Sequence, residues 1–164
     1  MIPIGHTLPV FDILVAVVRS REWEFEQLTA SEAIAHVPSL RFSHTYKLGA
    51  RRVADQDGLY FDLSRDAVVP WKMHRALQAT ARRLNLHAGL TTFSFAINAE
   101  LKLRCGWNLY RTKPEQKPDA IEKKLDDALV RMDYGWDAIQ IVSHTGMNPV
   151  DAVQLAKRRA EGKR

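Results

Sequence analysis

Residues 93–109 read FSFAINAELKLRCGWNL, and this stretch decides the fold class of the chain. Every odd position in it is apolar, whereas most even positions are polar. The apolar set is Phe93, Phe95, Ile97, Ala99, Leu101, Leu103, Cys105, Trp107 and Leu109. A helix would spread these side chains over all its faces, but a β-strand places them on one face. We therefore predict β structure here, either one bent strand or a hairpin with a three-residue loop at 98–100.

Further strands are predicted around this stretch. Residues 21–27 alternate between aromatic and acidic side chains, as in a half-exposed strand. Residues 41–54 and 59–64 also alternate, and the turn-forming residues 55–58 separate them. In residues 10–18 the odd and the even positions are both largely apolar. This pattern favours a strand buried on both faces and leaves a short buried helix as the alternative. A short link would then join this strand to the next one as a hairpin.

Helical signals appear at two places before the C-terminal third. Thr29 and Glu32 have the spacing of a capping box, which predicts a short helix that ends before Pro38. Residues 70–87 carry apolar side chains at the helical period, with cations elsewhere on the helix surface.

The C-terminal third is predicted to be helical. Residues 113–118 contain two prolines and follow neither the helical nor the strand period of apolar residues, which is typical of a linker. The helices expected beyond it, separated by Gly135 and Gly146, are 119–133, 136–144 and 148–160.

Together these elements predict an α+β fold: a mostly antiparallel N-terminal sheet with one or two helices, followed by a C-terminal three-helix module. The expected domains are an α+β domain at 1–112 with a basic middle segment, the linker at 113–118 and the helical module at 119–164.

The composition excludes several classes of protein. The chain has 164 residues, 46% hydrophobic and 26% charged, which suits one globular domain, or one domain with a small appendage. Cys105 is the single cysteine, so an internal disulfide is excluded. The longest apolar run, 13–18, is too short to cross a bilayer, and the N-terminus lacks the pattern of a secretory signal. We therefore expect a cytoplasmic protein that makes no membrane contact.

Positive charge is concentrated in the middle and at the end of the chain. Residues 41–111 have a net charge of +7 and residues 157–164 a net charge of +4, whereas 1–40 and 112–156 are each at −3. Clustered Lys and Arg attract a phosphate backbone, so the preferred function is non-enzymatic nucleic-acid binding, with DNA favoured over RNA and a regulatory role, such as transcription regulation. The predicted binding residues are Arg51, Arg52, Lys72, Arg75, Arg82, Arg83, Lys102, Arg104, Arg111, Asn148, Lys157, Arg158 and Arg159. Tyr46, Tyr60 and Tyr110 would stack on bases if they lie on an exposed sheet face.

The segment 141–155 resembles a helix-turn-helix. In that resemblance Gly146 makes the turn, Met147 and Ala152 pack between the helices, and Leu155 anchors the second helix. The resemblance implies that the helix starting at Asn148 enters the major groove with its first turns.

The same part of the chain also resembles a ubiquitin-associated (UBA-like) three-helix module. The Met-Gly-Phe loop of that family is echoed by residues 132–134, and its third helix by residues 148–155. This resemblance implies an adaptor that binds a protein partner, or a second copy of the chain, through residues 119–164.

An enzymatic alternative rests on three residues. Asp62, Glu100 and Lys102 resemble the Asp…Glu-x-Lys core of metal-dependent nucleases, in which the carboxylates hold Mg²⁺. The six histidines show no metal-ligand spacing, and the chain has no glycine-rich phosphate loop. The preferred interpretation therefore has no catalytic residues, no metal and no cofactor.

Overall fold

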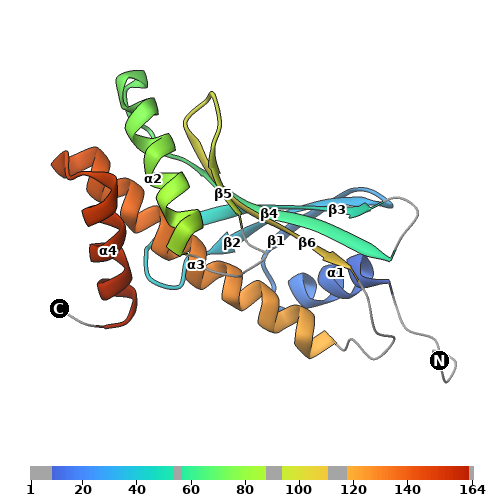
Figure 1. The fold of residues 1–164 in the computed structure, drawn as a ribbon. Helices are drawn as coiled ribbons and strands as arrows, with labels where there is room; N and C mark the ends of the chain where they lie inside the picture. The colour runs from blue at the N-terminus through green and yellow to red at the C-terminus, as the bar shows by residue number, and fades with distance from the viewer. Residues whose placement is uncertain (1–8, 54–56, 88–93, 111–117, 163–164) are drawn as a thin grey trace, which may run out of the picture.

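The computed structural model describes residues 9–53, 57–87, 94–110 and 118–162. Within these ranges, six strands and four α-helices confirm the predicted α+β fold class (Figure 1). The elements in chain order are α1 (Val10–Ser20), β1 (Glu24–Thr29), β2 (Glu32–Pro38), β3 (Thr45–Val53), β4 (Gly58–Asp66), the short 3-10 helix η1 (Trp71–Met73), α2 (His74–His87), β5 (Ser94–Ile97), β6 (Lys102–Tyr110), α3 (Pro118–Thr145) and α4 (Pro149–Ala160).

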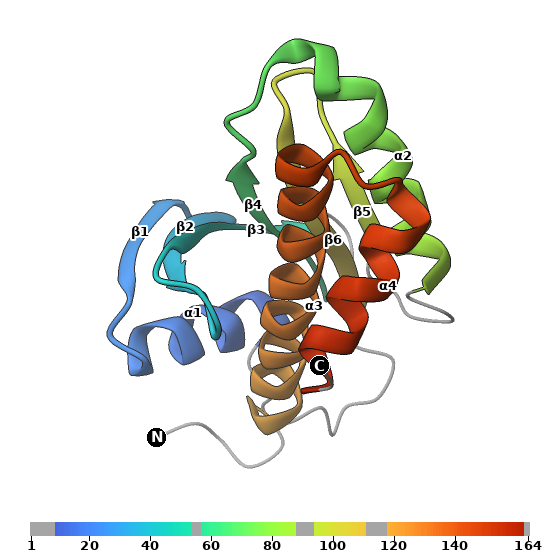
Figure 2. The ribbon, with the colours of Figure 1, turned by 90° about the vertical axis from the view of Figure 1, so that its left-hand side faces the viewer.

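The strands form one antiparallel sheet in the order β1-β2-β3-β4-β6-β5. A single row of cross-strand neighbours identifies the buried face of this sheet. The row consists of Ala35, Leu48, Leu63, Cys105 and Phe95, all of which are buried. Helices α1 and α3 pack on this face, and α2 and α4 lie at one end of the sheet (Figure 2). The opposite face is open to solvent over β1, β2 and β3.

The stretch at 93–109 is confirmed as a hairpin of β5 and β6, although residue 93 itself lies outside the described ranges. The Asn98 side chain accepts the backbone N–H groups of Glu100 and Lys102, each at 2.9 Å, and so closes the turn. The predicted strands 41–54 and 59–64 are confirmed as β3 and β4, which pair with each other. Part of the turn between them lies outside the described residues.

Helix α2 covers the free edge of the hairpin. The helix predicted at 70–87 is confirmed, with η1 as its first turn. The Asn85 amide donates to the carbonyl oxygen of Phe95 at 2.9 Å, and its oxygen accepts the Phe95 N–H at 2.6 Å. Because an edge strand presents unpaired backbone groups, these two bonds block further strand pairing at this position.

Residues 10–18 belong to α1, so the prediction of a buried strand is wrong and its helical alternative is confirmed. An unbroken apolar run satisfies the period of a strand and that of a helix equally well, so the run alone does not discriminate between them. In the structure the run forms one layer of the core against the sheet and α3. The predicted hairpin with 21–27 is therefore wrong as well, because β1 pairs with β2.

The short helix predicted after Thr29 is also wrong, because this segment forms the turn of the β1–β2 hairpin and the strand β2. The Thr29 hydroxyl accepts the N–H of Ser31 at 3.1 Å, so it caps a turn and not a helix. Residues Ala33, Ala35 and Val37 are buried at a period of two and pair with β3 along the whole strand. The pairing with β3 overrides the local capping signal.

The described residues of the C-terminal third, 118–162, form two helices, so the prediction of three is wrong. Helix α3 runs without interruption through Gly135. A Cβ atom added at Gly135 would lie 3.1 Å from Cδ1 of Phe95 and closer still to Cε1, so this glycine allows α3 to approach β5. Residues 132–134, which echo the loop of the UBA-like module, lie inside the same helix. Of the predicted linker 113–118, only Pro118 lies within the described residues, at the start of α3.

The predicted turn near the C-terminus is confirmed. Helix α3 ends at Thr145, and Gly146 has a φ of +70°, a left-handed conformation that glycine adopts without strain. The Asn148 side chain accepts the N–H of Asp151 and so caps α4, which begins at Pro149.

A buried carboxylate joins α3 to the chain between β2 and β3. Asp133 has no exposed surface, and Ser39 Oγ and Tyr46 Oη each donate to its Oδ1 at 2.5 Å. The N–H groups of Leu40 and Arg41 donate to its Oδ2 at 2.9 and 3.1 Å. A carboxylate without hydrogen-bond donors is costly to bury, so these four bonds stabilise this loop against α3.

Within the described residues, no helix is long and apolar enough to span a membrane.

Replacing Gly135 by Ala is expected to destabilise the protein by about 1–3 kcal/mol, because the added methyl group collides with Phe95. In a helix without this contact the same change would stabilise by about 1 kcal/mol. Urea denaturation measures the effect, and the double variant Gly135→Ala/Phe95→Leu serves as the control. The collision is disproved if the double variant loses as much stability as the two single variants together.

Replacing Asp133 by Asn is expected to cost at least about 3 kcal/mol, because the amide group cannot accept all four hydrogen bonds in the buried site. The control is Asp127→Asn, which removes a charge from an exposed position of the same helix. Equal unfolding free energies for the two variants would contradict a special role for Asp133.

Candidate nucleic-acid interface

Two of the predicted binding residues on the sheet, Lys102 and Arg104, lie on its open face and have acidic partners there. Arg104 donates two hydrogen bonds to Asp62 Oδ2, one of them from Nε at 2.8 Å. Lys102 Nζ lies 3.9 Å from Asp66 Oδ1. The register places three more carboxylates on the same face of the sheet, Glu24, Glu26 and Glu32. The open face therefore carries mixed charge.

Arg51 lies beside a hollow on the same face. Asp62 is only 6% exposed there, and its cross-strand neighbours on both sides are glycines, Gly49 and Gly106. The hollow has a volume of about 410 Å³, and a Cβ at Gly106 would lie 2.9 Å from the Tyr60 hydroxyl. The Arg51 guanidinium lies 5.0 Å from the centre of the Tyr60 ring. Burial and the Asp62 carboxylate raise the pKa of Tyr60, so its phenol is neutral at physiological pH.

Arg52 does not join this group, because it lies on the other side of β3. Its register partner is the buried Leu59, and its Nη2 lies 3.2 Å from Asp12 Oδ2 on α1. Arg111 lies outside the described residues.

The predicted binding residues of η1 and α2 are arranged differently. Lys72, Arg75 and Arg82 are exposed, and Arg83 is half-buried. The opposite side of the helix is buried in the core through Leu77, Thr80, Ala81 and Leu84. Residues 67–99 contain no Asp or Glu. Among the described residues, none of these four cations has a carboxylate within 4.0 Å, so the charges of Lys72, Arg75 and Arg82 face solvent without local neutralisation.

Helix α4 packs beside α2 and adds cations at its C-terminal end (Figures 1 and 2). Lys157 and Arg158 are exposed, and neither has an ion-pair partner among the residues that the structure describes. Arg159 differs, because its Nη1 lies 3.1 Å from Oδ1 of the buried Asp137. Asn148, at the other end of α4, uses its side chain for the helix cap.

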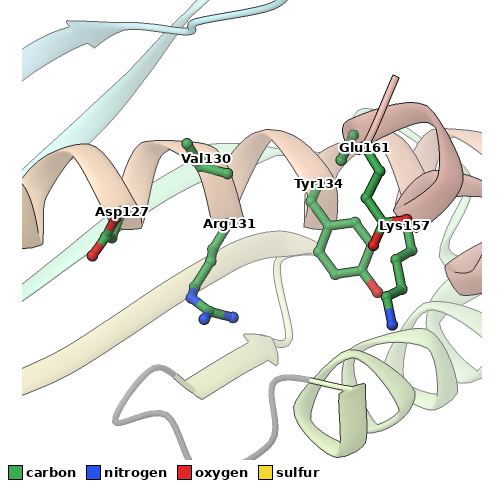
Figure 3. Close-up of a pocket in the computed structure, with 7 residues that line it drawn as sticks. Asp127, Val130, Arg131, Tyr134, Lys157 and Glu161 are labelled. Carbon is green, nitrogen blue, oxygen red and sulfur yellow. The ribbon is translucent and has the colours of Figure 1, made fainter. Parts of the chain in front are cut away.

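The cations of α2 and α4 approach each other near Tyr134 of α3. Figure 3 shows the Tyr134 hydroxyl directed toward Lys157, at a hollow of about 390 Å³ that is also lined by Arg131 and Glu161. Burial raises the pKa of Tyr134 to about 12, and the charges of Arg131 and Arg83 oppose that shift. Its hydroxyl is buried and has no hydrogen-bond partner among the described residues. Arg131 of α3 and Lys157 of α4 thus lie around this hollow together with the carboxylates of Asp127 and Glu161.

The structure does not bring the nuclease-like residues together. Lys102 is the register partner of Asp66. Asp62 precedes Asp66 by four residues in β4, and four residues span about 13 Å in an extended strand. Glu100 lies in the turn before β6, on the far side of Lys102 from Asp62. Within the described ranges, no group of three or more His, Cys, Asp or Glu side chains is placed to hold a metal ion.

The aromatic residues also differ from expectation. Tyr46 is fully buried and donates to Asp133, so it is not available for stacking on a base. Tyr60 is half-buried beneath Arg51, and the side chain of Tyr110 lies outside the described part of the chain. The sequence interpretation missed Trp71, which is 61% exposed at the start of the basic helix. The available signal was its position next to Pro70 and Lys72, just ahead of the helical pattern.

Comparisons with protein-family models, with curated protein sequences and with solved structures find no match for this chain.

Arg104→Ala is expected to destabilise the fold by about 1–3 kcal/mol, because it leaves Asp62 buried without its main donor. The double variant Asp62→Ala/Arg104→Ala removes both partners and should recover part of this loss. Thermal and urea unfolding of the two variants measure the difference. A double variant less stable than Arg104→Ala would show that the pair does not act as a structural unit.

Proposed function

We propose that this protein binds nucleic acid, with DNA as the preferred polymer, in a regulatory role that involves no catalysis. The interface consists of five exposed cations of η1, α2 and the end of α4, together with the half-buried Arg83 of α2; we call it the helical basic surface. It comprises Lys72, Arg75, Arg82, Arg83, Lys157 and Arg158.

The observation that supports this proposal most directly is the contrast in charge pairing between the two sides of the molecule. The sheet cations Lys102 and Arg104 lie against carboxylates, so the field of each is largely cancelled at the surface. The helical basic surface has no such partners among the described residues. Uncompensated charge of one sign attracts a polyanion and releases its counterions on binding.

The proposal does not depend on insertion of the first turn of α4 into a major groove. Asn148 caps the helix there, and Asp151, which carries negative charge, is exposed beside it. The cations of the helical basic surface would contact phosphates and not base edges, which predicts low sequence specificity. Such a role also implies an intracellular location, as the sequence predicts.

The experiment is a salt titration of binding to fluorescein-labelled DNA and RNA oligonucleotides, followed by fluorescence anisotropy from about 50 to about 200 mM KCl. The double variant Arg75→Glu/Arg82→Glu should weaken binding by on the order of tenfold or more. The slope of log Kobs against log [salt] should become shallower by at least about 1.4, because two phosphate contacts are lost.

The matched control is Lys47→Glu/Lys123→Glu, which changes the net charge by the same amount at two exposed positions on β3 and α3. We expect this control to retain most of the wild-type affinity. Equal losses in both double variants would show that net charge alone attracts the polymer. Absence of salt-dependent binding to either polymer would refute the proposed function.

A further inference from the structure

The connection between β4 and α2 exposes apolar side chains next to the helical basic surface. Val68 is 88% exposed and Trp71 is 61% exposed. Val68 has a φ of +51°, a left-handed conformation that is strained for a β-branched residue. Pro70 then restricts the backbone, and its carbonyl oxygen accepts the N–H of Met73 at 2.9 Å, which closes the single turn of η1. The indole is thus held outside the core by an ordered segment of backbone.

One face of the Trp71 indole is already occupied. The ring of His74 is stacked on it, with the centroids 4.3 Å apart and the planes 19° from parallel. Since His74 covers one face, the exposed area of Trp71 belongs to the other face and the ring edge. An exposed aromatic face, fixed by a stacked neighbour, is the element on which single-strand-binding proteins place a base.

The position of Trp71 relative to the cations follows from helical geometry. Trp71 belongs to the 3-10 turn η1, which has three residues per turn, so its indole lies on the same side as His74, the residue with which it stacks. Arg75 follows His74 directly in α2, and Arg82, seven residues after Arg75, points to about the same side of the helix as Arg75. Three steps at a 3-10 rise of about 2.0 Å and eight at an α-helical rise of about 1.5 Å place Trp71 and Arg82 about 18 Å apart along the axis. Leu86, four residues beyond Arg82, continues the same exposed stripe and is 72% exposed.

We propose that Trp71 is a base-stacking platform and that the helical basic surface accordingly selects single-stranded over double-stranded nucleic acid. This inference rests on the proposed function. In a duplex the bases are stacked on each other and inaccessible to the indole, whereas a single strand can place one base on Trp71 and its phosphates on Arg75 and Arg82.

The test compares Trp71→Ala and Trp71→Phe in binding to a labelled oligothymidylate and to a labelled DNA hairpin duplex of mixed sequence. Trp71→Ala should weaken oligothymidylate binding by about five- to hundredfold. It should change duplex binding less than twofold, because phosphate contacts remain. Trp71→Phe should recover much of the single-strand affinity, because it retains an aromatic face.

The matched control is Trp23→Phe, which alters a half-buried tryptophan next to β1, on a different part of the protein. It should leave binding to both probes unchanged. Circular dichroism and thermal unfolding establish that each variant is folded, and the exposure of Trp71 predicts that they are. Quenching of intrinsic fluorescence by oligothymidylate should be smaller in Trp71→Phe than in the wild type, because the stacked indole is absent.

The outcomes separate this inference from the function on which it rests. If the wild type binds both probes with equal affinity and Trp71→Ala changes neither, stacking is wrong although polyanion binding stands. If neither probe binds the wild type, the proposed function itself fails. Vesicles of phosphatidylserine and phosphatidylcholine form a third probe. If Trp71→Ala abolishes vesicle binding and leaves oligothymidylate binding intact, the indole inserts into lipid and the inference is overturned.

Discussion

The Asp133 carboxylate accepts hydrogen bonds from two hydroxyl groups and two backbone amides, all contributed by residues 39–46. A charge with no exposed surface tolerates few alternative arrangements, because any displacement of the loop leaves either the carboxylate or its donors unpaired. The position of α3 against the sheet follows from this constraint. Gly135, two residues further along, lets the helix approach Phe95, and Arg21 binds Glu122 and Asp126 of the same helix, each at 2.7 Å. Helix α1 is therefore tied to the same element.

Placement of α3 and α1 on one face of the sheet has a consequence for the distribution of charge. The buried face is mostly apolar, so most charged residues of the strands project from the open face; the exceptions are Arg52, beside Asp12 of α1, and Arg65, over the Trp136 ring of α3. On the open face the charges of β1 and β2 are acidic, and those of β3, β4 and β6 alternate in sign between neighbouring strands, so that cross-strand pairs such as Arg104 and Asp62 form. Helix α2 lies outside this arrangement. It packs on the edge strand β5 with one side and presents the other side to solvent, in a segment that contains no acidic residue. The sheet cations Lys102 and Arg104 are thus paired with carboxylates, whereas Lys72, Arg75 and Arg82 of η1 and α2 have no carboxylate within 4.0 Å among the described residues.

Much of the candidate interface could be predicted from the sequence, because the absence of Asp and Glu from residues 67–99 and the helical period of 70–87 are both local properties. The separation of Arg51 from Arg52 follows from strand alternation and was predictable in principle. The acidic partner of each sheet cation was not predictable, because it depends on which strands are neighbours in the sheet. Strand β4 pairs with β6 across α2 and β5, and no local pattern contains that information. The exposure of Trp71 likewise depends on how the segment before α2 leaves the sheet.

The sequence alone determined that residues 93–109 form β structure, that α2 is a helix with one charged side, and that the chain turns at Gly146, because these features depend on the period of side chains and on the backbone freedom of glycine. Tertiary structure decided three other features. Residues 10–18 form a helix and not a strand, and the segment with the capping signal forms β2. Helix α3 continues through Gly135 without a break. In each of these three cases the local preference is small compared with the free energy of burying an apolar face. The outcome therefore depended on the surface that was available to cover it.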